Sequence, residues 1–389
     1  MSFNSSVLSQ ILKLVPRLEF EQLANQCDGK RRSDALPRWS QFSALLIGHL
    51  SNRRSLRDIE STIQTQAGNF YHCGMKSVSR SSLGRANEQL DSDFFTQLFA
   101  LLYQRCVQHQ PRHGFRFKHK LFSLDGSLID LSMKLFPWAK YNRMKSAFKL
   151  HVGLDHDGLI PAFVSITDGK AGEVEQADQW DFPKGSVLVF DKGYSRYSWH
   201  KSLTDRGLFW VTRIRGNALY RVSERRDVSK YPNITSDQTI VYTSQRAKGY
   251  DLYPVRRIGY KDPETGKRYV FTTNQFAWSP QTIADIYKQR WQVELFFKWI
   301  KQNLKIKTFL GVSRNAVMTQ IMVALCSYLL LSYLKFESKI SRSLQEILQL
   351  LQINLFMRRP LLELLLPKQK PPPDDYQQEF CLTRDYVRQ

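Results

Sequence analysis

The sequence predicts an α/β domain with a largely covered sheet, preceded by an all-helical region. Between residues 117 and 214, short apolar runs of the kind found in buried strands alternate with helical segments. This alternation is typical of α/β cores. Before residue 115 the apolar spacing is helical throughout, without strand-like alternation. A length of 389 residues allows two or three domains and excludes a single small module.

Residues 1–115 are expected to form a helical DNA-binding region. Basic clusters at Lys30–Arg32, Arg53–Arg57 and Arg80–Arg85 interrupt its apolar, helical spacing. The segment Ser51–Ile63 fits a basic helix with capping residues at its start. Helix, turn and basic helix is a pattern of DNA-binding proteins. Basic helices that merely face solvent have the same pattern, so that alternative stays open.

The charge of the chain indicates a polyanionic partner. Lys and Arg total 57 against 35 Asp and Glu, which gives a formal net charge of +22 spread along the chain. Nucleic acid is the first candidate and an anionic membrane surface the second. The five cysteines are widely separated and show no CxxC spacing, so neither a disulfide framework nor a structural zinc site is indicated. The first residues lack the features of a signal peptide, and we expect a cytoplasmic location.

Five strands are expected in the α/β part, with a short helix before the fourth. They are Leu121–Leu124, Phe148–Leu154, Ile160–Ile166, Val187–Phe190 and Gly207–Ile214. The first strand ends at Asp125 and the fourth at Asp191, and a glycine follows each acid within two residues. In α/β sheets, ligands bind beyond the carboxyl ends of strands. A single acid there is more often a helix cap or a turn residue, so neither Asp alone identifies a site.

The stretch Thr282–Lys301 is predicted to be a mostly buried helix with one polar stripe. At about 100° per residue, Tyr287, Arg290, Glu294 and Lys301 fall within a stripe roughly 60° wide, and apolar side chains cover most of the remainder. Burying unpaired charges is costly, so this stripe should line a cleft, pair internally, or meet metal ions and phosphates. The simpler alternative is a solvated face with one Arg-to-Glu pair at i,i+4 spacing.

Asp125, Asp191 and Glu294 together predict a metal site. Three converging carboxylates repel one another unless divalent cations bind them, and hard oxygen ligands select Mg²⁺ or Mn²⁺. Two such ions about 4 Å apart can activate an attacking oxygen and stabilise a leaving one during phosphodiester displacement. A basic protein could carry out this chemistry on DNA. Asp130 is an alternative to Asp125, and we prefer Asp125 because it directly ends the apolar strand.

The remaining segments frame these motifs. Residues 217–274 are predicted to be a β insertion, whose cations either protect edge strands or follow phosphates. Ala316–Leu334 is nearly long and apolar enough to span a membrane, but its polar residues favour a buried core helix. Helical spacing over Ser343–Phe356 fits packing on the body or self-association. Prolines from Pro360 onward predict a mobile tail. We therefore divide the chain into domains at 1–115, 116–335 and 336–389.

The motifs, in this order, resemble a known family. Asp-Gly-Ser at Asp125, Asp-x-Gly-Tyr at Asp191–Tyr194, a β insertion, and Tyr-xx-Arg-xxx-Glu-xxxxxx-Lys at Tyr287–Lys301 are similar to the DDE transposases of bacterial insertion sequences. The similarity is to the group defined by the Tyr-Arg-Glu-Lys signature. It covers about residues 117–333 and implies a ribonuclease H-like fold. The basic N-terminal region is similar to the DNA-binding leader often joined to this catalytic domain.

The resemblance also implies a reaction and its residues. Asp125, Asp191 and Glu294 would be the catalytic triad that binds two Mg²⁺ or Mn²⁺ ions. Water would cut one strand at the element's end, and the freed 3′-hydroxyl would attack the opposite strand to give a hairpin, which is reopened and joined to target DNA. The residues expected to contact DNA are Tyr287, Arg290, Lys301, Trp291 and Tyr194. The Trp291 ring could stack on an unpaired base, and packing in the core is the alternative.

The expected partner is double-stranded DNA, both transposon ends and target, bound by a homodimer and without a membrane. Two other classes of function stay open. One is a DNA-binding protein that keeps the fold without the chemistry, and the other is a metal-dependent nuclease without strand transfer. A peripheral membrane protein is a remote alternative that rests on Ala316–Leu334 and the positive charge.

Overall fold

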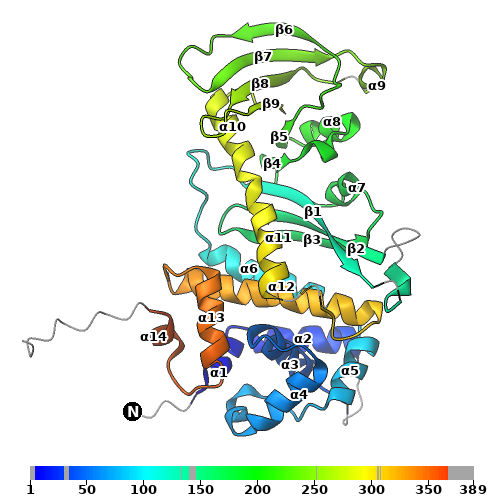
Figure 1. Cartoon of the computed structure of the whole chain (residues 1–389), viewed down its shortest axis with the longest axis vertical. Coiled ribbons are helices and arrows are strands. Elements are labelled where there is room, and N and C mark those ends of the chain that lie inside the picture. Colours follow the sequence, from blue (N-terminus) through cyan, green and yellow to red (C-terminus); the bar gives the residue numbers. More distant parts are fainter. Residues whose placement is uncertain are drawn as a thin grey trace, which may run out of the picture.

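The computed structural model describes residues 5–29, 35–132, 134–139, 146–250, 252–304, 306 and 308–366. Within these residues the chain forms a helical part and a part built on one nine-stranded sheet (Figure 1). The basic cluster Lys30–Arg32 and most of the proline-containing tail, from residue 367 on, lie outside the described residues.

The helical part joins the two ends of the described chain. Its N-terminal helices are α1 (Val7–Leu12), α2 (Arg17–Asp28), α3 (Arg38–Leu50), α4 (Leu56–Thr65), α5 (Arg80–Gln89) and α6 (Asp93–His109). The short 3₁₀ helices η1 (Ala67–Asn69) and η2 (Tyr71–Cys73) lie between α4 and α5, and α13 (Leu344–Asn354) and α14 (Leu361–Leu365) complete the part. No strand occurs among the described residues before Leu121, as the helical spacing predicted.

One long helix, α12 (Arg314–Glu337), is the centre of the helical part. It contacts α3, α5, α6 and α13, and it is buried along almost its whole length. It is the one helix of the described chain that is long and apolar enough to cross a membrane, and nearly all of its most apolar stretch is covered by the rest of the protein. The prediction of a buried core helix over Ala316–Leu334 therefore agrees with the structure.

Serine side chains begin several of these helices. Ser55 accepts a hydrogen bond from the Asp58 backbone N–H at the start of α4, and Ser79 and Ser343 form capping boxes at α5 and α13. Each such cap satisfies backbone donors that the first helical turn leaves free. The side chains of Ile347, Leu348 and Leu351 on α13 are buried against the body, so this face packs within the chain rather than facing a partner.

The sheet has the strand order β3-β2-β1-β4-β5-β9-β8-β7-β6. Its strands are β1 (Leu121–Leu131), β2 (Ser146–Asp155), β3 (Ile160–Asp168), β4 (Val187–Phe190), β5 (Phe209–Arg213), β6 (Tyr220–Arg226), β7 (Ile234–Tyr242), β8 (Val255–Lys261) and β9 (Arg268–Thr273). The pairs β1–β4 and β4–β5 are parallel, and the other pairs are antiparallel. The predicted β insertion is thus not a separate domain, because β9 pairs directly with β5 and extends the same sheet.

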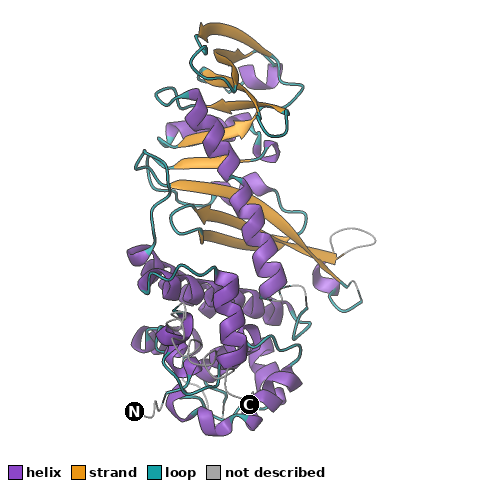
Figure 2. Ribbon diagram, turned by 60° about the vertical axis from the view of Figure 1, so that its left-hand side comes forward, coloured by secondary structure: helices purple, strands orange, loops and turns teal. Residues whose placement is uncertain are grey.

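Helices cover both faces of the parallel strands. Figure 2 shows the helices that cover one of these faces. On one face α10 (Pro280–Gln289) contacts β4, β5, β7, β8 and β9, and α11 (Trp291–Asn303) contacts β1 and β2. On the other face lie α7 (Glu173–Asp178), α8 (Tyr197–Asp205) and the turn η4 (Lys192–Tyr194). Leu188 and Phe190 pack toward α7 and α8, whereas Val187 and Val189 pack toward α10, which is the alternation expected of a strand buried on both faces.

Two predictions about the site's framework were wrong in detail. The first strand does not end at Asp125 but continues to Leu131, paired there with β2 alone. The helix predicted over Thr282–Lys301 is two helices that meet at Arg290. Around Arg290 the backbone makes i to i+3 hydrogen bonds, Arg290 N–H to Tyr287 C=O at 3.1 Å and Val293 N–H to Arg290 C=O at 3.2 Å. Such tighter bonds interrupt the α-helical ladder without proline or glycine.

Candidate active site

The parallel pairing of β1 with β4 places two carboxylates side by side. The pairing ends at Leu124 opposite Phe190, so Asp125 and Asp191 are the next residue on each strand. Asp125 Oδ1 accepts a hydrogen bond from the Gly126 N–H at 2.9 Å. Asp191 Oδ1 accepts one from the Gly193 N–H at 2.6 Å and so caps the η4 turn. Both acids therefore lie at the carboxyl edge of the parallel strands, where α/β sheets bind ligands.

Arg290 connects the third carboxylate to the first. Its guanidinium donates to Glu294 Oε1 at 2.6 Å and also attracts the Asp125 carboxylate. The same group lies 5.8 Å from the centre of the Tyr287 ring. The Arg290 guanidinium, at the junction of α10 and α11, thus links Glu294 to Asp125 on β1.

The Asp125 carboxyl is buried enough to resist ionisation. Burial raises the pKa of Asp125 to about 7, and the nearby carboxylates of Glu173 and Asp191 act in the same direction. The Gly126 N–H and Arg290 oppose the shift. A buried carboxylate with other acids beside it is an arrangement that a bound cation would stabilise in its charged form.

Lys301 fastens the far end of α11 to β1. Its ammonium donates to Ser127 Oγ at 2.6 Å and to the Leu128 carbonyl at 3.0 Å. Glu294 lies seven residues earlier on the same face of α11. Lys301 therefore fixes the helix on the strand that carries Asp125.

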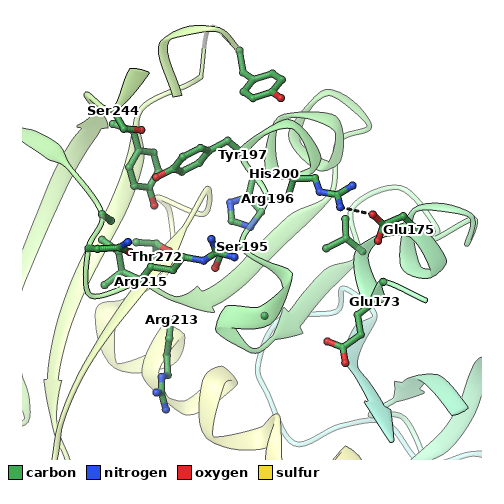
Figure 3. A pocket seen from close by; sticks show the side chains of 18 of the residues that line it. Glu173, Glu175, Ser195, Arg196, Tyr197, His200, Arg213, Arg215, Ser244 and Thr272 are labelled. Atoms are coloured by element: carbon green, nitrogen blue, oxygen red, sulfur yellow. Dashed lines mark hydrogen bonds and ion pairs between the residues drawn. The ribbon is translucent and has the colours of Figure 1, made fainter. Parts of the chain in front are cut away.

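An open pocket borders the carboxylates on the α7 and α8 side (Figure 3). Its volume is about 1400 Å³, and it lies between α7, α8, the end of β5 and the loops of the strand insertion. The cations that line it are Lys149, Lys170, Arg196, Arg213 and Arg215. Glu173 and Gly193 lie both in this lining and beside the aspartates, so the pocket opens directly next to the acidic edge.

Comparison with known proteins identifies the family. Residues 116–330 match the family described as Transposase DDE domain, which is more than half of the chain. The chain belongs to this transposase family. Residues 3–76 match a second family, described as a domain of unknown function (DUF4372).

Curated relatives agree with this assignment. The transposase is 30% identical over 301 residues to "Putative transposase y4zB" of Sinorhizobium fredii, covering 76% of this chain and 82% of the relative. It is 28% identical over 273 residues to "Probable transposase for insertion sequence element IS5377" of Geobacillus stearothermophilus, covering 68% and 70%. A cryo-EM structure of a piggyBac transposase synaptic complex with hairpin DNA matches 95% of this chain and 86% of that chain at 14% identity and TM-score 0.44. That likeness is too distant to support an inference.

DDE transposase domains generally depend on divalent metal ions, and the donor set of this transposase fits such ions. Carboxylate oxygens are the ligands that Mg²⁺ and Mn²⁺ prefer. Here the Glu294 carboxylate is paired with Arg290 and that of Glu173 with Lys149. Within the described ranges, no three His, Cys, Asp or Glu side chains lie close enough to hold one ion in this arrangement. Binding an ion here would therefore require Glu294 and Glu173 to turn away from Arg290 and Lys149.

The other residues selected from the sequence lie in different environments. The Tyr287 ring is buried and packs on Phe271 with ring centres 4.7 Å apart. Trp291 is 55% exposed, which rules out the alternative of core packing. Tyr194 is only 1% exposed and packs against Phe190 and Trp199. Its ring supports the β4 edge in this structure and is not accessible to DNA.

Asp130, the alternative to Asp125, lies further along β1. It is exposed and pairs with Ala147 on β2, beyond the region where β1 meets β4. The strand register therefore brings Asp125, and not Asp130, next to Asp191.

Two site residues were missed by the sequence analysis. Glu173 begins α7 and reaches the glycines that follow both aspartates, and Arg213 ends β5 beside Tyr287. The local sequence around Glu173 carries no recognisable motif, because its position depends on the crossover from β3 to β4. The one signal available was the pair Gly126 and Gly193, small residues one and two positions after the two acids.

Proposed function

We propose that this chain is a transposase of the Tyr-Arg-Glu-Lys group that binds the terminal inverted repeats of an insertion sequence, cuts the ends and joins them to target DNA. The observation that carries the proposal is that Asp125 and Asp191 directly follow the parallel pairing of β1 with β4, and that Arg290 links Glu294 to Asp125. The order β3-β2-β1-β4-β5, with two parallel pairs at its centre, supports a ribonuclease H-like core.

In this proposal Asp125, Asp191 and Glu294 would hold two Mg²⁺ or Mn²⁺ ions, which would supply Lewis-acid activation of the attacking and leaving oxygens. Glu294 would have to leave Arg290 to serve as a ligand. The Arg290 guanidinium would then be available to a phosphate as a bidentate donor. Water cuts the first strand, and the 3′-hydroxyl produced attacks the opposite strand to give a hairpin, which is reopened before joining to target DNA.

The DNA-contacting roles follow the exposure of the side chains. The exposed Trp291 ring can stack on an unpaired base at the hairpin step. Arg290 and Lys301 lie at the two ends of the face that carries Glu294 and are suited to phosphates. The buried Tyr287 ring acts by packing beside Arg290 and Arg213.

Larger basic surfaces fit the duplex. Exposed arginines of α4 and α5, among them Arg57, Arg80 and Arg85, fit the flanking DNA of an inverted repeat. The cations of the pocket in Figure 3 fit the backbone of a strand that leaves the carboxylates. We expect two copies to act together on two ends in the bacterial cytoplasm, where the chromosome lies.

Cleavage of a labelled duplex that carries the element's own end tests this proposal. We expect the native chain with Mg²⁺ to cut at the end and produce hairpins. Glu294→Gln should cut at least about a hundredfold more slowly, because the variant loses one ligand of the proposed metal site. It should bind the same duplex normally, because the substitution removes no contact of the hydrophobic core. Glu19→Gln, an exposed acid on α2, is the matched control and should cut normally.

The outcomes separate the alternative functions. Cutting without hairpins or joined products would identify a metal-dependent nuclease. Salt-dependent binding without any cutting by the native chain would identify a DNA-binding protein and reject the proposal.

A further inference from the structure

A fourth carboxylate, that of Glu173, lies against Gly126 and Gly193, the glycines that follow the two aspartates. An added Cβ at Gly126 would lie 3.1 Å from Glu173 Oε1, and one at Gly193 would lie 3.5 Å from Glu173 Oε2. Gly126 directly follows Asp125, and Gly193 follows Asp191 by two residues. The two oxygens of one carboxylate therefore reach the backbone that follows each aspartate, in β1 after Asp125 and in the η4 turn after Asp191.

The glycines leave the room that this carboxylate occupies. The added Cβ at Gly193 would also lie 2.8 Å from Asp191 Oδ1, so Asp191 and Glu173 lie against the same backbone position. Neither Gly126 nor Gly193 has a positive φ, so the backbone conformation does not require glycine there. Space for the acids is the physical reason for glycine at both positions.

A cation of the chain lies at the same place. Lys149 Nζ is 2.6 Å from Glu173 Oε1, and Lys149 Cε would lie 2.8 Å from a Cβ at Gly126. Both side chains are largely buried, and Lys149 comes from β2, opposite Leu128 of β1. An ammonium group thus neutralises Glu173 beside the glycine that follows Asp125. A bound divalent ion would also place positive charge beside Glu173.

We propose that Glu173 is a fourth oxygen ligand of the divalent cation held by Asp125 and Asp191, and that the Lys149 ammonium competes with this cation for Glu173. The inference rests on the proposed function, because it adds a ligand to the metal site of that reaction. A residue that served only as the acidic first turn of α7 would not need space at two glycines on two strands.

Mn²⁺ binding by the full-length chain, measured by electron paramagnetic resonance without DNA, tests the inference independently of activity. Glu173→Gln keeps the shape of the side chain and removes its charge. It should weaken Mn²⁺ binding at least about tenfold, because a charged oxygen ligand is lost. Lys149→Met should strengthen binding several-fold, because the competing cation is gone. Thermal unfolding of each variant confirms that it is folded.

Two further variants make the result specific. Glu175→Gln alters the other acid in the first turn of α7, which pairs with Arg196, and should bind Mn²⁺ like the native chain. Asp125→Asn removes a ligand of the proposed metal site itself and should abolish tight binding. If Glu173→Gln binds Mn²⁺ as tightly as the native chain does and Asp125→Asn does not bind it, Glu173 is not a ligand. The proposed function would then remain intact.

The remaining outcomes are also decisive. Unchanged or weaker binding by a folded Lys149→Met would overturn the competition between ammonium and metal ion. A native chain that binds no Mn²⁺ would overturn both this inference and the metal centre on which it rests.

Discussion

Acids and cations of the same chain are paired at the site. Arg290 holds Glu294, and Lys149 holds Glu173, whereas Asp125 is partly buried with a raised pKa. Repulsion among clustered carboxylates is costly in a partly buried site, and these two cations offset it. In the proposed function, binding metal ions would exchange these protein cations for the charge of the ions.

The first residue-scale prediction concerns Gly126→Ala. The added methyl group meets only Lys149 Cε and Glu173, the far ends of flexible side chains. We expect the free energy of unfolding to fall by no more than about 1–2 kcal/mol, while Mg²⁺-dependent cutting falls at least about tenfold. Gly216→Ala is the control for the reduced backbone freedom of alanine, because nothing lies within 4 Å of the added carbon there. Normal cutting by Gly126→Ala would show that Glu173 has no part in the reaction.

The second residue-scale prediction concerns pH and His200. This ring is buried and stacks on Trp210 with centres 4.3 Å apart, and burial lowers the pKa of His200 to about 3. A lowered histidine pKa contributes stability that is complete above about pH 6.5 and is lost as the pH falls toward 3. At pH 5 the loss should be about 2 kcal/mol relative to pH 7.

Urea unfolding of His200→Phe at pH 7 and pH 5 measures this contribution. The variant keeps an aromatic ring against Trp210 and should lose less stability on acidification than the native chain. The exposed His72→Phe should follow the native chain. Equal losses in the native chain and in His200→Phe would contradict the assignment.

At the scale of elements, the predictable features were those set by local pattern. Apolar runs predicted β1 to β5, and helical spacing predicted α12 and α13, because burial and periodicity are read over a few neighbouring residues. The continuation of β1 past Asp125 depends on its pairing with β2. The break at Arg290 lies in a sequence without proline or glycine. Strand pairing and hydrogen-bond register depend on tertiary structure, so they could not be predicted from a short stretch of sequence.

The candidate site follows the same division. Asp125 and Asp191 could be selected because an acid directly after an apolar strand is a local signal. Glu173 could not, since α7 reaches the site only through the crossover between β3 and β4. The burial of Tyr194 could not be predicted from the sequence either, because it depends on packing against Trp199 of the next helix.

The element-scale prediction concerns α5. If its exposed arginines follow the duplex backbone, Arg80→Ala with Arg85→Ala should weaken binding to every sequence. The slope of log K against log salt should then fall by about 2 in magnitude, because each phosphate contact contributes about 0.9. The control is Lys13→Ala with Lys184→Ala, which removes two exposed cations elsewhere in the chain. Lys184 precedes β4 and so lies at the edge of the sheet opposite the acids. An unchanged slope in the α5 variant would exclude this helix from the interface.

At the scale of the whole molecule, the fold places the parallel strands β1, β4 and β5 between the helical part and the strand insertion. The helical part lies at one end of the chain's long axis and the strand insertion at the other, with α10 and α11 running between them across the strands (Figure 1). A duplex that contacts both regions passes the acids. In the proposed function each copy has one cutting site, and we therefore expect two copies to act when two ends are joined.

Sedimentation of the chain with and without a labelled end tests the assembly. We expect complexes that contain two copies and two duplexes under conditions where cutting occurs. A complex of one copy and one duplex at every active concentration would show that synapsis is not part of the reaction.

The measurement that most directly tests the central claim, one metal-binding site built from β1, β4 and α11, is metal rescue of cysteine variants. Mg²⁺ is a hard cation that prefers oxygen, whereas Mn²⁺ accepts sulfur more readily. Asp125→Cys, Asp191→Cys and Glu294→Cys should not cut with Mg²⁺ and should regain cutting with Mn²⁺, whereas Asp205→Cys, at the exposed end of α8, should cut with either ion. Full activity of any of the three variants with Mg²⁺, or no recovery of all three with Mn²⁺, would contradict the account.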